Sequence, residues 1–369
     1  MRLNKILFIL HLPPPVHGSS IMGLYIKESE IINTNYDCNY IDLGTSKTID
    51  EIGKKSIGKI FRYFAIIGAV FKALIIHRPA ICYFAITVKG VGFYKDTLIV
   101  LLVKLFRIKL VYHLHNKGVS KRENKLLDNL LYRFVFKNSE VILLSPRLYP
   151  DIQKYVSLNE VHYCPNGVQF INSFTKSEIV KDRVEILFLS NMIKKKGVYI
   201  LLDACELLKR KNLNFYCTFV GGQGDITDQQ FIDKVATKGL ANHVKYVGKK
   251  LGNEKSDFFT KAHIFAFPTY YDHETFGLVN LEAMQYELPI VSTFEGGIPD
   301  VIENGLTGFL VPQEDSNELS EKLALLIQNK ELREEMGKKG RIRYEQNFTL
   351  KHFENNLVTI LNKCLLLKN

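Results

Sequence analysis

Short apolar runs alternate with longer helical patterns along the whole chain, and this alternation constrains the fold more than any other feature. The apolar runs predicted as strands are Ile6–His11, Tyr40–Leu43, Ala80–Ala85, Leu110–His115, Val141–Leu144 and Val161–Cys164, then Glu185–Leu189, Phe215–Val220, Val244–Val247, Ile264–Phe267, Ile290–Ser292 and Gly308–Val311. Strands separated by helices form parallel sheets with helices on both faces. Because the alternation occurs twice, the sequence predicts an α/β protein with two Rossmann-like domains.

The length of the chain agrees with this division. A chain of 369 residues is too long for one ordinary core and suits two domains of roughly 150–200 residues each. The polar segment Asn166–Lys181 has weak apolar periodicity and is the predicted linker. We therefore place an N-terminal domain at residues 1–170 and a C-terminal domain at residues 171–345. Residues 346–369 are predicted to contain a helix that packs on its own domain or back toward the N-terminal domain.

The positive charge is confined to the first half of the chain. Residues 1–170 hold 23 Lys+Arg and 12 Asp+Glu, whereas residues 171–369 hold 26 of each, so the net charge of +11 arises in the first half. A strongly basic half of a chain is typical of proteins that bind an anionic partner, such as nucleic acid, an anionic membrane surface or a phosphorylated substrate. A solvated surface without a partner is the alternative. No zinc-finger or RNA-recognition signature supports nucleic acid.

The cysteines and the N-terminus indicate a cytoplasmic protein. Six scattered cysteines without a C-x-x-C pair argue against a zinc site and a disulfide framework. The segment Arg2–Leu12 has a basic start and a short apolar run, but Pro13-Pro14-Pro15 follows it in place of a small-residue cleavage site. We interpret this run as the first strand. The stretch Thr97–Leu110 is too short and too charged to span a bilayer.

The strongest motif is Pro268–Met284, which reads PTYYDHETFGLVNLEAM and follows a predicted strand. A helix is predicted to start at Gly277 or Leu278, and its free N–H groups favour an anion such as a diphosphate. An ordinary turn with solvated glutamates is the alternative. Eight helical positions between Glu274 and Glu282 span about 12 Å, more than the roughly 5–9.5 Å between glycosidase carboxylates. The spacing therefore favours two separate binding roles, and a carboxylate is a good acceptor for paired sugar or ribose hydroxyls.

Three further residues follow or precede predicted strands where a ligand would bind. Lys196 is the only one of three consecutive lysines that lies against a helix start, so it is predicted to meet a phosphate. Gly18 belongs to a turn that either cradles a phosphate or caps a helix. His115 ends a strand and is predicted to act as a hydrogen-bond donor or a local charge near a leaving phosphate, whereas His113 lies deeper and is predicted to be a core residue.

The segment Glu274–Val311 resembles the C-terminal domain of family-4 glycosyltransferases of the group 1 type, which have the GT-B fold. It carries E-x-F-G-L-V-x-L-E-A-M, then P-I-V-S-T-F-E-G-G-I-P-D-V-I and G-L-T-G-F-L-V. The motifs K-K-G-V, P-N-G-V at Pro165–Val168 and V-K-Y-V-G at Val244–Gly248 precede it in the expected order. The resemblance implies two facing domains with an interdomain cleft, a nucleotide diphosphate sugar as donor, retention of configuration, and neither metal nor cofactor.

The resemblance also implies roles for individual residues. The implied donor-binding residues are Gly18, Asn191, Lys196, Glu274, Thr275, Phe276, Gly277, Leu278 and Glu282, and the implied catalytic residues are His115, Glu274 and Lys196. Within this set Glu274 contacts the sugar, Glu282 the ribose, and Lys196 with the backbone amides after Glu274 the diphosphate. Many members carry Arg where this chain has Asn191, so one phosphate charge is absent here.

The expected function is transfer of a hexose-type sugar to a hydroxyl of a glycan or lipid-linked saccharide, in the synthesis of a cell-surface polysaccharide such as lipopolysaccharide or capsule. The basic N-terminal domain is expected to bind an anionic membrane surface peripherally, through Ile57–His77 or Lys121–Lys137. Packing of these helices on their sheet with a charged outer face is the alternative. A non-catalytic nucleotide-sugar-binding protein and a GT-B sugar-nucleotide epimerase are the alternative functions.

Overall fold

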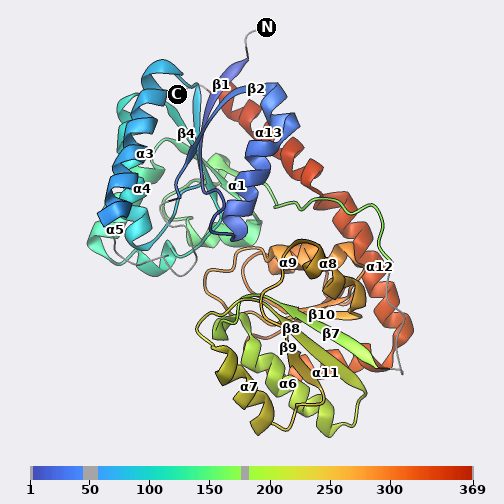
Figure 1. Ribbon diagram of the computed structural model, residues 1–369. Helices are drawn as coiled ribbons and strands as arrows, with labels where there is room; N and C mark the ends of the chain where they lie inside the picture. Colours follow the sequence, from blue (N-terminus) through green and yellow to red (C-terminus); the bar gives the residue numbers. More distant parts are fainter. Residues whose placement is uncertain (1–2, 45–56, 176–182, 368–369) are drawn as a thin grey trace. The chain divides into compact units, whose positions relative to one another are not determined.

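The computed structural model describes residues 3–44, 57–175 and 183–367. The chain divides into two compact units, the first formed by residues 1–166 with residues 350–369, and the second by residues 167–349. Each unit contains a six-stranded parallel sheet with helices on both faces (Figure 1). All twelve predicted strands are present, and their ends lie within four residues of the predicted ones. The predicted α/β class and the two Rossmann-like sheets are therefore confirmed. The last residues of the predicted linker, 176–181, lie outside the described residues.

The sheet of the first unit has the strand order β2-β1-β3-β4-β5-β6. Its strands are β1 (Asn4–Leu10), β2 (Tyr36–Asp42), β3 (Ile81–Phe84), β4 (Lys109–Leu114), β5 (Ser139–Leu143) and β6 (Val161–Tyr163). Strand β1 pairs with β2 on one side and β3 on the other. Its residues Ile6–Leu10 are buried, as expected of a central parallel strand covered on both faces.

The helices of the first unit lie on opposite faces of this sheet. The chain runs from β2 through β3 and β4 to β5 in one direction, so right-handed crossovers place the three connecting helices on one face. These are α3 (Ile57–Ile76), α4 (Gly90–Leu105) and α5 (Leu126–Phe136), and Figure 1 shows them side by side. The other helices are α1 (Gly18–Glu28), α2 (Glu30–Asn35) and α13 (Leu350–Leu366). Helix α13, the predicted terminal helix, belongs to this unit and packs beside α2.

The apolar periodicity of the sequence also predicts helices over Met22–Ile32 and Pro150–Val156, and both differ from the structure. The predicted helix Met22–Ile32 is two helices, because Ser29 takes an extended backbone and its hydroxyl caps α2 by accepting from Ile32 N at 3.1 Å. The predicted helix Pro150–Val156 is wrong. A short 3₁₀ helix, Pro146–Asp151, occupies this region, and Ser145 caps it. Proline suits the first turn of a helix and disfavours a regular helix around it. This explains why the helical segment begins at Pro146, before the predicted start at Pro150.

The sheet of the second unit has the order β12-β11-β10-β7-β8-β9. Its strands are β7 (Val184–Leu189), β8 (Phe215–Val220), β9 (Val244–Tyr246), β10 (Ile264–Phe267), β11 (Ile290–Thr293) and β12 (Gly308–Val311). The helices are α6 (Val198–Arg210), α7 (Asp228–Thr237), α8 (Gly252–Lys261), α9 (Leu278–Gln285), α10 (Ile298–Val301), α11 (Ser316–Gln328) and α12 (Lys330–Asn347). Helices α6, α7 and α11 cover one face, and α8, α9 and α12 the other (Figure 1).

The order of these strands reverses direction after β9, and this reversal makes β7 and β10 neighbours. Two strands separate β7 from β10 along the chain, yet their C-terminal ends lie side by side in the sheet. Ligands of open parallel sheets bind at such a switch point. The loops that follow β7 and β10 contain the predicted residues Lys196 and Glu274.

Candidate active site

The loop after β7 carries the three lysines and packs directly on the loop after β10. Residues Lys194–Lys196 form one 3₁₀ turn, and Gly197 then adopts the left-handed region with φ of 89° before α6 begins. A Cβ atom on Gly197 would lie 2.1 Å from the carbonyl oxygen of Pro268, so only glycine fits. The amide of Tyr270 donates to the carbonyl of Lys195 at 2.8 Å. The position of Lys196 is therefore fixed by the end of β10.

Lys196 and Glu274 form an ion pair at the N-terminus of α9. Lys196 Nζ lies 2.5 Å from Glu274 Oε2, and the two side chains are only 16% and 12% exposed. The other carboxylate oxygen, Oε1, accepts from the amide of Gly277 at 3.1 Å. Lys196 Nζ also lies 4.7 Å from the ring centroid of Tyr271 and 5.5 Å from that of Phe267. The lysine, the carboxylate and the helix N-terminus thus form one charged, partly buried cluster.

The loop after β11 closes against the backbone of the same segment. The amide of Gly297 donates to the carbonyl of Thr275 at 2.8 Å. Gly296 has φ of 55°, and a Cβ atom there would lie 2.5 Å from the carbonyl oxygen of Glu274. Loops from three neighbouring strands, β7, β10 and β11, therefore converge on Glu274 and Thr275. This packing holds the backbone before α9 in place.

Helix α9 starts at Leu278, as predicted, and Gly277 precedes it in the left-handed region with φ of 71°. Phe276 is buried, and its ring centroid lies 6.0 Å from that of Phe348. Thr275 is also buried. The predicted donor-binding segment Glu274–Leu278 is therefore anchored by its side chains, while its backbone leads into the helix N-terminus. The amide of Gly277, one of those predicted to bind a diphosphate, donates to the carboxylate of Glu274 in this structure.

Glu282 lies in the second turn of α9 and makes a separate ion pair. Both of its oxygens accept from Lys255 Nζ of α8, at 2.7 and 2.6 Å, and each side chain is about a quarter exposed. The two glutamates thus have different lysine partners, which agrees with two separate roles. Asn191 follows β7, and its side-chain oxygen lies near Gly222, in the loop after β8.

In the first unit, the predicted residues Gly18 and His115 lie with other histidines at the C-terminal ends of β1 and β4. Gly18 is the first residue of α1, and His17 caps this helix by accepting from Ser20 N at 3.2 Å. The His115 ring lies 4.2 Å from that of His113, measured between centroids. His113 is fully buried and hydrogen bonds to the hydroxyl of Tyr83 through Nδ1 at 2.5 Å, as expected of a core residue.

The surroundings of His115 decide its charge, which matters because it was predicted either to donate a hydrogen bond or to carry a local charge. Burial, followed by the neighbouring His11 and His17, lowers the pKa of His115 to about 3. Burial and His17 likewise lower the pKa of His11 to about 4. His115 is therefore neutral near pH 7, because desolvation and like charge both disfavour the imidazolium. A neutral imidazole can donate or accept a hydrogen bond, and the predicted role of His115 beside a leaving phosphate stays a prediction.

Comparison with known proteins identifies the second unit. Residues 169–343 match the model of the family described as glycosyl transferases group 1. The match covers 175 of the 369 residues, so it is this domain that resembles the group 1 glycosyl transferases. The resemblance of the Glu274–Val311 motifs to that family is thereby confirmed. The matched residues include Lys196, Glu274 and Glu282, so the charged cluster belongs to the group 1 domain.

The curated relatives include glycosyltransferases of polysaccharide synthesis. The chain is 28% identical over 188 residues to the capsular polysaccharide biosynthesis glycosyltransferase CapM of Staphylococcus aureus, covering 51% of this chain and 48% of CapM. It is 28% identical over 233 residues to the amylovoran biosynthesis glycosyltransferase AmsK of Erwinia amylovora, covering 61% of this chain and 57% of AmsK. The match therefore spans about half of the length of these relatives.

The solved structures match nearly the whole chain. Anabaena Alr3699/HepE in complex with UDP and glucose gives a TM-score of 0.73 at 18% identity, covering 97% of this chain and 99% of that one. WaaG, a glycosyltransferase involved in lipopolysaccharide biosynthesis, gives 0.69 at 16% identity, covering 96% and 99%. At these identities the likeness shows the fold, and it confirms the predicted GT-B fold.

Sequence reasoning missed several residues that shape the group 1 site. Tyr271 lies beneath the ammonium of Lys196, and Lys255 holds Glu282. Neither residue stands out in the sequence, because a tyrosine in a loop and a lysine in a polar helix are common. The strand preceding Tyr271 is the only available signal, since residues just after a strand lie at the ligand-binding edge. For Lys255 no local signal exists.

Asn280, in the first turn of α9, is a buried polar residue that the sequence did not single out. It is fully buried, and neither its amide nitrogen nor its oxygen has a hydrogen-bond partner in the described part of the chain. A buried amide without partners costs stability, whereas an apolar side chain of similar size does not. We expect Asn280→Leu to raise the free energy of unfolding by about 1 kcal/mol, measured by thermal or urea denaturation.

The matched control is Gln285→Leu at the other end of α9. Gln285 is also buried, but its oxygen accepts from the amide of Ile171 at 3.0 Å. This substitution leaves a backbone donor unpaired and should lower the free energy of unfolding by about 1–3 kcal/mol. Destabilisation by Asn280→Leu to the same extent would mean that Asn280 has a partner, such as an ordered water, and would contradict the prediction.

The histidines of the first unit predict acid sensitivity. A histidine titrates near 6.5 in the unfolded chain, while His115 and His11 titrate at about 3 and 4 in the folded unit. The unfolded chain therefore binds more protons below pH 6.5, so stability is full above that pH and falls as the pH drops toward 4. We expect a loss of about 1 kcal/mol per pH unit for each histidine, measured by denaturation between pH 7.5 and 4.5. The double variant His11→Gln/His115→Gln should have a shallower pH dependence; an equal slope would contradict the assignment.

One cluster in the described chain offers metal-ligand atoms. Glu140, His162 and Cys364 place such atoms within 4.8 Å of one another in the first unit. Lys109 Nζ already lies 3.7 Å from Glu140, and His162 Nε2 lies 2.9 Å from it. Burial, followed by Glu140, raises the pKa of the Cys364 thiol to about 12, so a thiolate is strongly disfavoured. The cluster fits an internal polar network, in which Cys364 Sγ lies 3.8 Å from His162 Nε2 and links α13 to β6.

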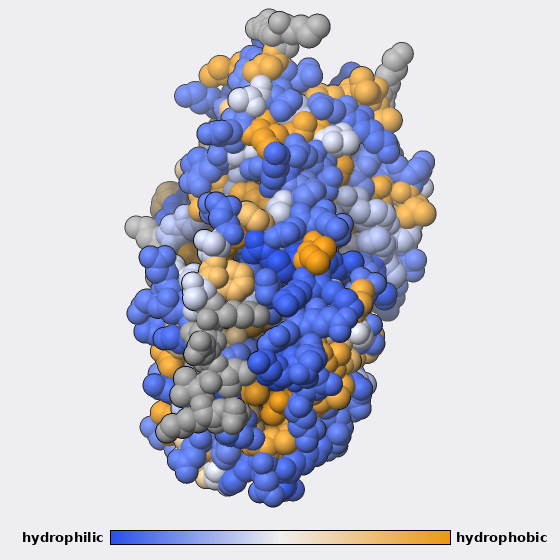
Figure 2. All heavy atoms as spheres, turned by 90° about the vertical axis from the view of Figure 1, so that its right-hand side faces the viewer, coloured by the Kyte–Doolittle hydropathy of each residue, from blue (hydrophilic) through white to orange (hydrophobic). Residues whose placement is uncertain are grey.

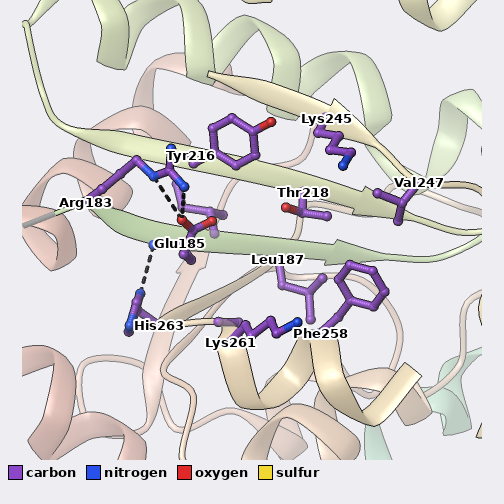
Figure 3. A pocket seen from close by; sticks show the side chains of 12 residues that line it. Arg183, Glu185, Leu187, Tyr216, Thr218, Lys245, Val247, Phe258, Lys261 and His263 are labelled. Carbon is purple, nitrogen blue, oxygen red and sulfur yellow. Dashed lines mark hydrogen bonds and ion pairs between the residues drawn. The ribbon is translucent and has the colours of Figure 1, made fainter. Parts of the chain in front are cut away.

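A pocket with a volume of about 710 Å³ lies against β7, β8 and β9, beside α8 (Figure 3). Its charged residue Arg183 is paired with Glu185 at 2.8 Å and lies over the ring of Tyr216. None of the predicted site residues lines this pocket. It opens on the face of the sheet, whereas the loops at the C-terminal strand ends carry the charged cluster, so we place the candidate site at those loops.

Proposed function

We propose that this protein is a retaining glycosyltransferase that moves a hexose-type sugar from a nucleotide diphosphate sugar to a hydroxyl of a glycan or lipid-linked saccharide. The observation that carries the proposal is the Lys196–Glu274 ion pair at the N-terminus of α9. An ammonium and a helix N-terminus together favour a diphosphate, and a carboxylate beside them is a strong acceptor for sugar hydroxyls. The named roles of CapM and AmsK favour cell-surface polysaccharide synthesis as the setting.

The proposed reaction is a front-face displacement. The bond between the anomeric carbon and the phosphate oxygen breaks, and its electron pair passes to the leaving diphosphate. The acceptor oxygen bonds to the anomeric carbon from the same face, and its proton passes to that diphosphate. Lys196 and the helix N-terminus stabilise the negative charge that gathers on the leaving group. The balance of atoms requires neither a protein nucleophile nor a metal.

Each predicted residue has a role in this proposal. Glu274 accepts hydrogen bonds from the donor sugar and also holds Lys196 in place. Glu282 binds the ribose once Lys255 yields one carboxylate oxygen. Neutral His115 donates a hydrogen bond, and Gly18 lets the backbone of α1 approach a phosphate.

The experiment is a panel of UDP-, GDP-, ADP- and CDP-sugars with EDTA present, with donor binding measured by calorimetry and nucleotide release by a coupled assay. We expect one nucleotide sugar to bind and to be hydrolysed slowly without metal. Proton NMR of the transferred sugar then gives the anomeric configuration, which should equal that of the donor.

The same panel separates the alternatives. Binding without nucleotide release, even with acceptors supplied, would favour a non-catalytic nucleotide-sugar-binding protein. Release of nucleotide with a changed sugar epimer would favour an epimerase. A lack of response to every donor, or a requirement for a divalent metal, would contradict the proposal as stated.

A further inference from the structure

The outward faces of α3, α4 and α5 are apolar, which is the reverse of an ordinary surface helix. These helices cover one face of the sheet in the first unit and contain 14 of the 27 large hydrophobic side chains that are exposed in the described chain. The side that carries α12 shows hydrophobic residues scattered among hydrophilic ones (Figure 2). We call the exposed side of these three helices the α3–α5 surface.

Helix α3 provides the largest part of this surface. Its residues Ile66, Val70 and Leu74 are buried against the sheet. The opposite side carries Ile57, Phe61, Phe64, Phe71 and Ile75, which are 44–74% exposed. Their spacing of four, three, seven and four places them on one helical stripe. The helix is therefore apolar on both sides, a pattern expected only where both sides are covered.

The neighbouring helices continue the surface. On α4, Val91, Leu98, Leu101 and Leu105 are 43–71% exposed and follow at intervals of seven, three and four. On α5, the exposed residues are Leu126, Leu127 and Leu130. Helix α4 contacts α3 on one side and α5 on the other. The three stripes thus form one continuous layer that faces away from the sheet.

The charges of this layer are of one sign. Helices α3, α4 and α5 contain only two carboxylates, Asp96 and Asp128, and both are buried. Asp96 accepts from the amide of Thr87, and Asp128 from Arg122. Exposed basic residues at and around the helices include Arg62, Lys72, Arg107, Lys125, Arg133 and Lys137. The α3–α5 surface is therefore apolar with basic residues among and beside the hydrophobic ones, and it has no exposed acid.

We propose that the α3–α5 surface binds the interface of an anionic lipid membrane. Hydrophobic side chains on such a surface enter the boundary between headgroups and acyl chains, while lysine and arginine meet anionic headgroups. A second copy of this chain is a poorer occupant, because a two-fold contact would set the same basic residues against each other. No helix in the described residues is long and apolar enough to cross a membrane.

This inference rests on the exposed surface alone and not on the donor chemistry. It remains testable if the panel of nucleotide sugars fails. If the membrane proposal and the proposed sugar transfer are both correct, the α3–α5 surface brings the protein to the membrane in which a lipid-linked acceptor resides.

The test is flotation of the full chain with phosphatidylcholine vesicles, with and without about a quarter phosphatidylglycerol. We expect binding to the anionic vesicles at low salt and at least about tenfold weaker binding at 0.5 M NaCl, because salt screens the lipid charge. The double variant Phe61→Gln/Phe64→Gln should weaken binding at least about tenfold, since it removes two exposed aromatic rings from the surface. Both residues are more than half exposed, so the fold should be preserved, which circular dichroism checks.

The matched control is Ile232→Gln/Ile342→Gln, which removes two hydrophobic residues that are 52% exposed on α7 and α12 of the second unit. This control should bind vesicles as the wild type does. Absence of binding to anionic vesicles at low salt would overturn the proposal, as would equal loss in both double variants. A lipid-free dimer that the Phe61→Gln/Phe64→Gln variant abolishes would assign the surface to a second copy instead.

Discussion

Replacing Lys196 with alanine is expected to lower kcat/KM for sugar transfer by about 100- to 1,000-fold, the effect typical of losing one donor to a developing anion. The lysine is the only charged donor that the described structure places beside both Glu274 and the start of α9. Its loss removes positive charge where the leaving diphosphate gathers negative charge. It also leaves the carboxylate of Glu274 partly buried without its cation. The measurement is steady-state nucleotide release with the donor identified by the panel.

Lys195 supplies the matched control for this variant. It is the preceding residue, with the same charge, but its side chain is 50% exposed and it pairs with the exposed Asp272 at 3.2 Å. Lys195→Ala should change kcat/KM less than about threefold, because an exposed pair contributes little. Equal losses in the two variants would assign the effect to the net charge of the loop and would contradict a specific role for Lys196.

Glu274→Gln is the second substitution for which we expect a large effect, a loss of about 100-fold or more in kcat. Glutamine keeps the shape and can still accept from the amide of Gly277, so the start of α9 should persist. It loses the charge that strengthens hydrogen bonds to the donor sugar and that orients Lys196. Nucleotide release and donor binding are measured together, because a loss in kcat at unchanged donor affinity indicates a role in the transition state.

Two further variants give this result its meaning. Glu282→Gln should weaken donor binding more than it lowers kcat, because a ribose contact is the same in the ground state and the transition state. Asp272→Asn removes an exposed carboxylate from the same loop and should leave both parameters nearly unchanged. A Glu274→Gln variant with wild-type kcat would remove Glu274 from the proposed chemistry.

Local patterns were enough to predict the twelve strands and the start of α9. A buried parallel strand is a short apolar run, and a helix that follows a glycine-containing loop has a recognisable first turn. The placement of Glu274 in the loop and of Glu282 within α9 was also predictable, because the glycine-containing loop ends where the helical pattern begins. The predicted helix Met22–Ile32 was wrong because one polar residue outweighed the apolar pattern. The hydroxyl of Ser29 caps α2, so a second helix begins there.

The outer face of α3 shows a different limit. Its sequence was compatible with an interfacial helix and with a helix that packs on its sheet behind a charged outer face. The structure shows that α3 packs on its sheet and keeps an apolar outer side, so neither sequence description was complete. Periodicity could not decide this, because a helix that is apolar nearly all round has no clear buried side until the sheet is placed against it.

The sequence by itself determined the fold class, the two sheets and the loops in which charged residues follow strands. These depend on periodicity and on helix and strand ends, which act over a few residues. Only the tertiary structure decided that Lys196 pairs with Glu274, 78 positions away, and that Lys255 pairs with Glu282. The physical reason is the strand order: β10 inserts beside β7 rather than beside β9, and this long-range choice brings two distant loops into contact.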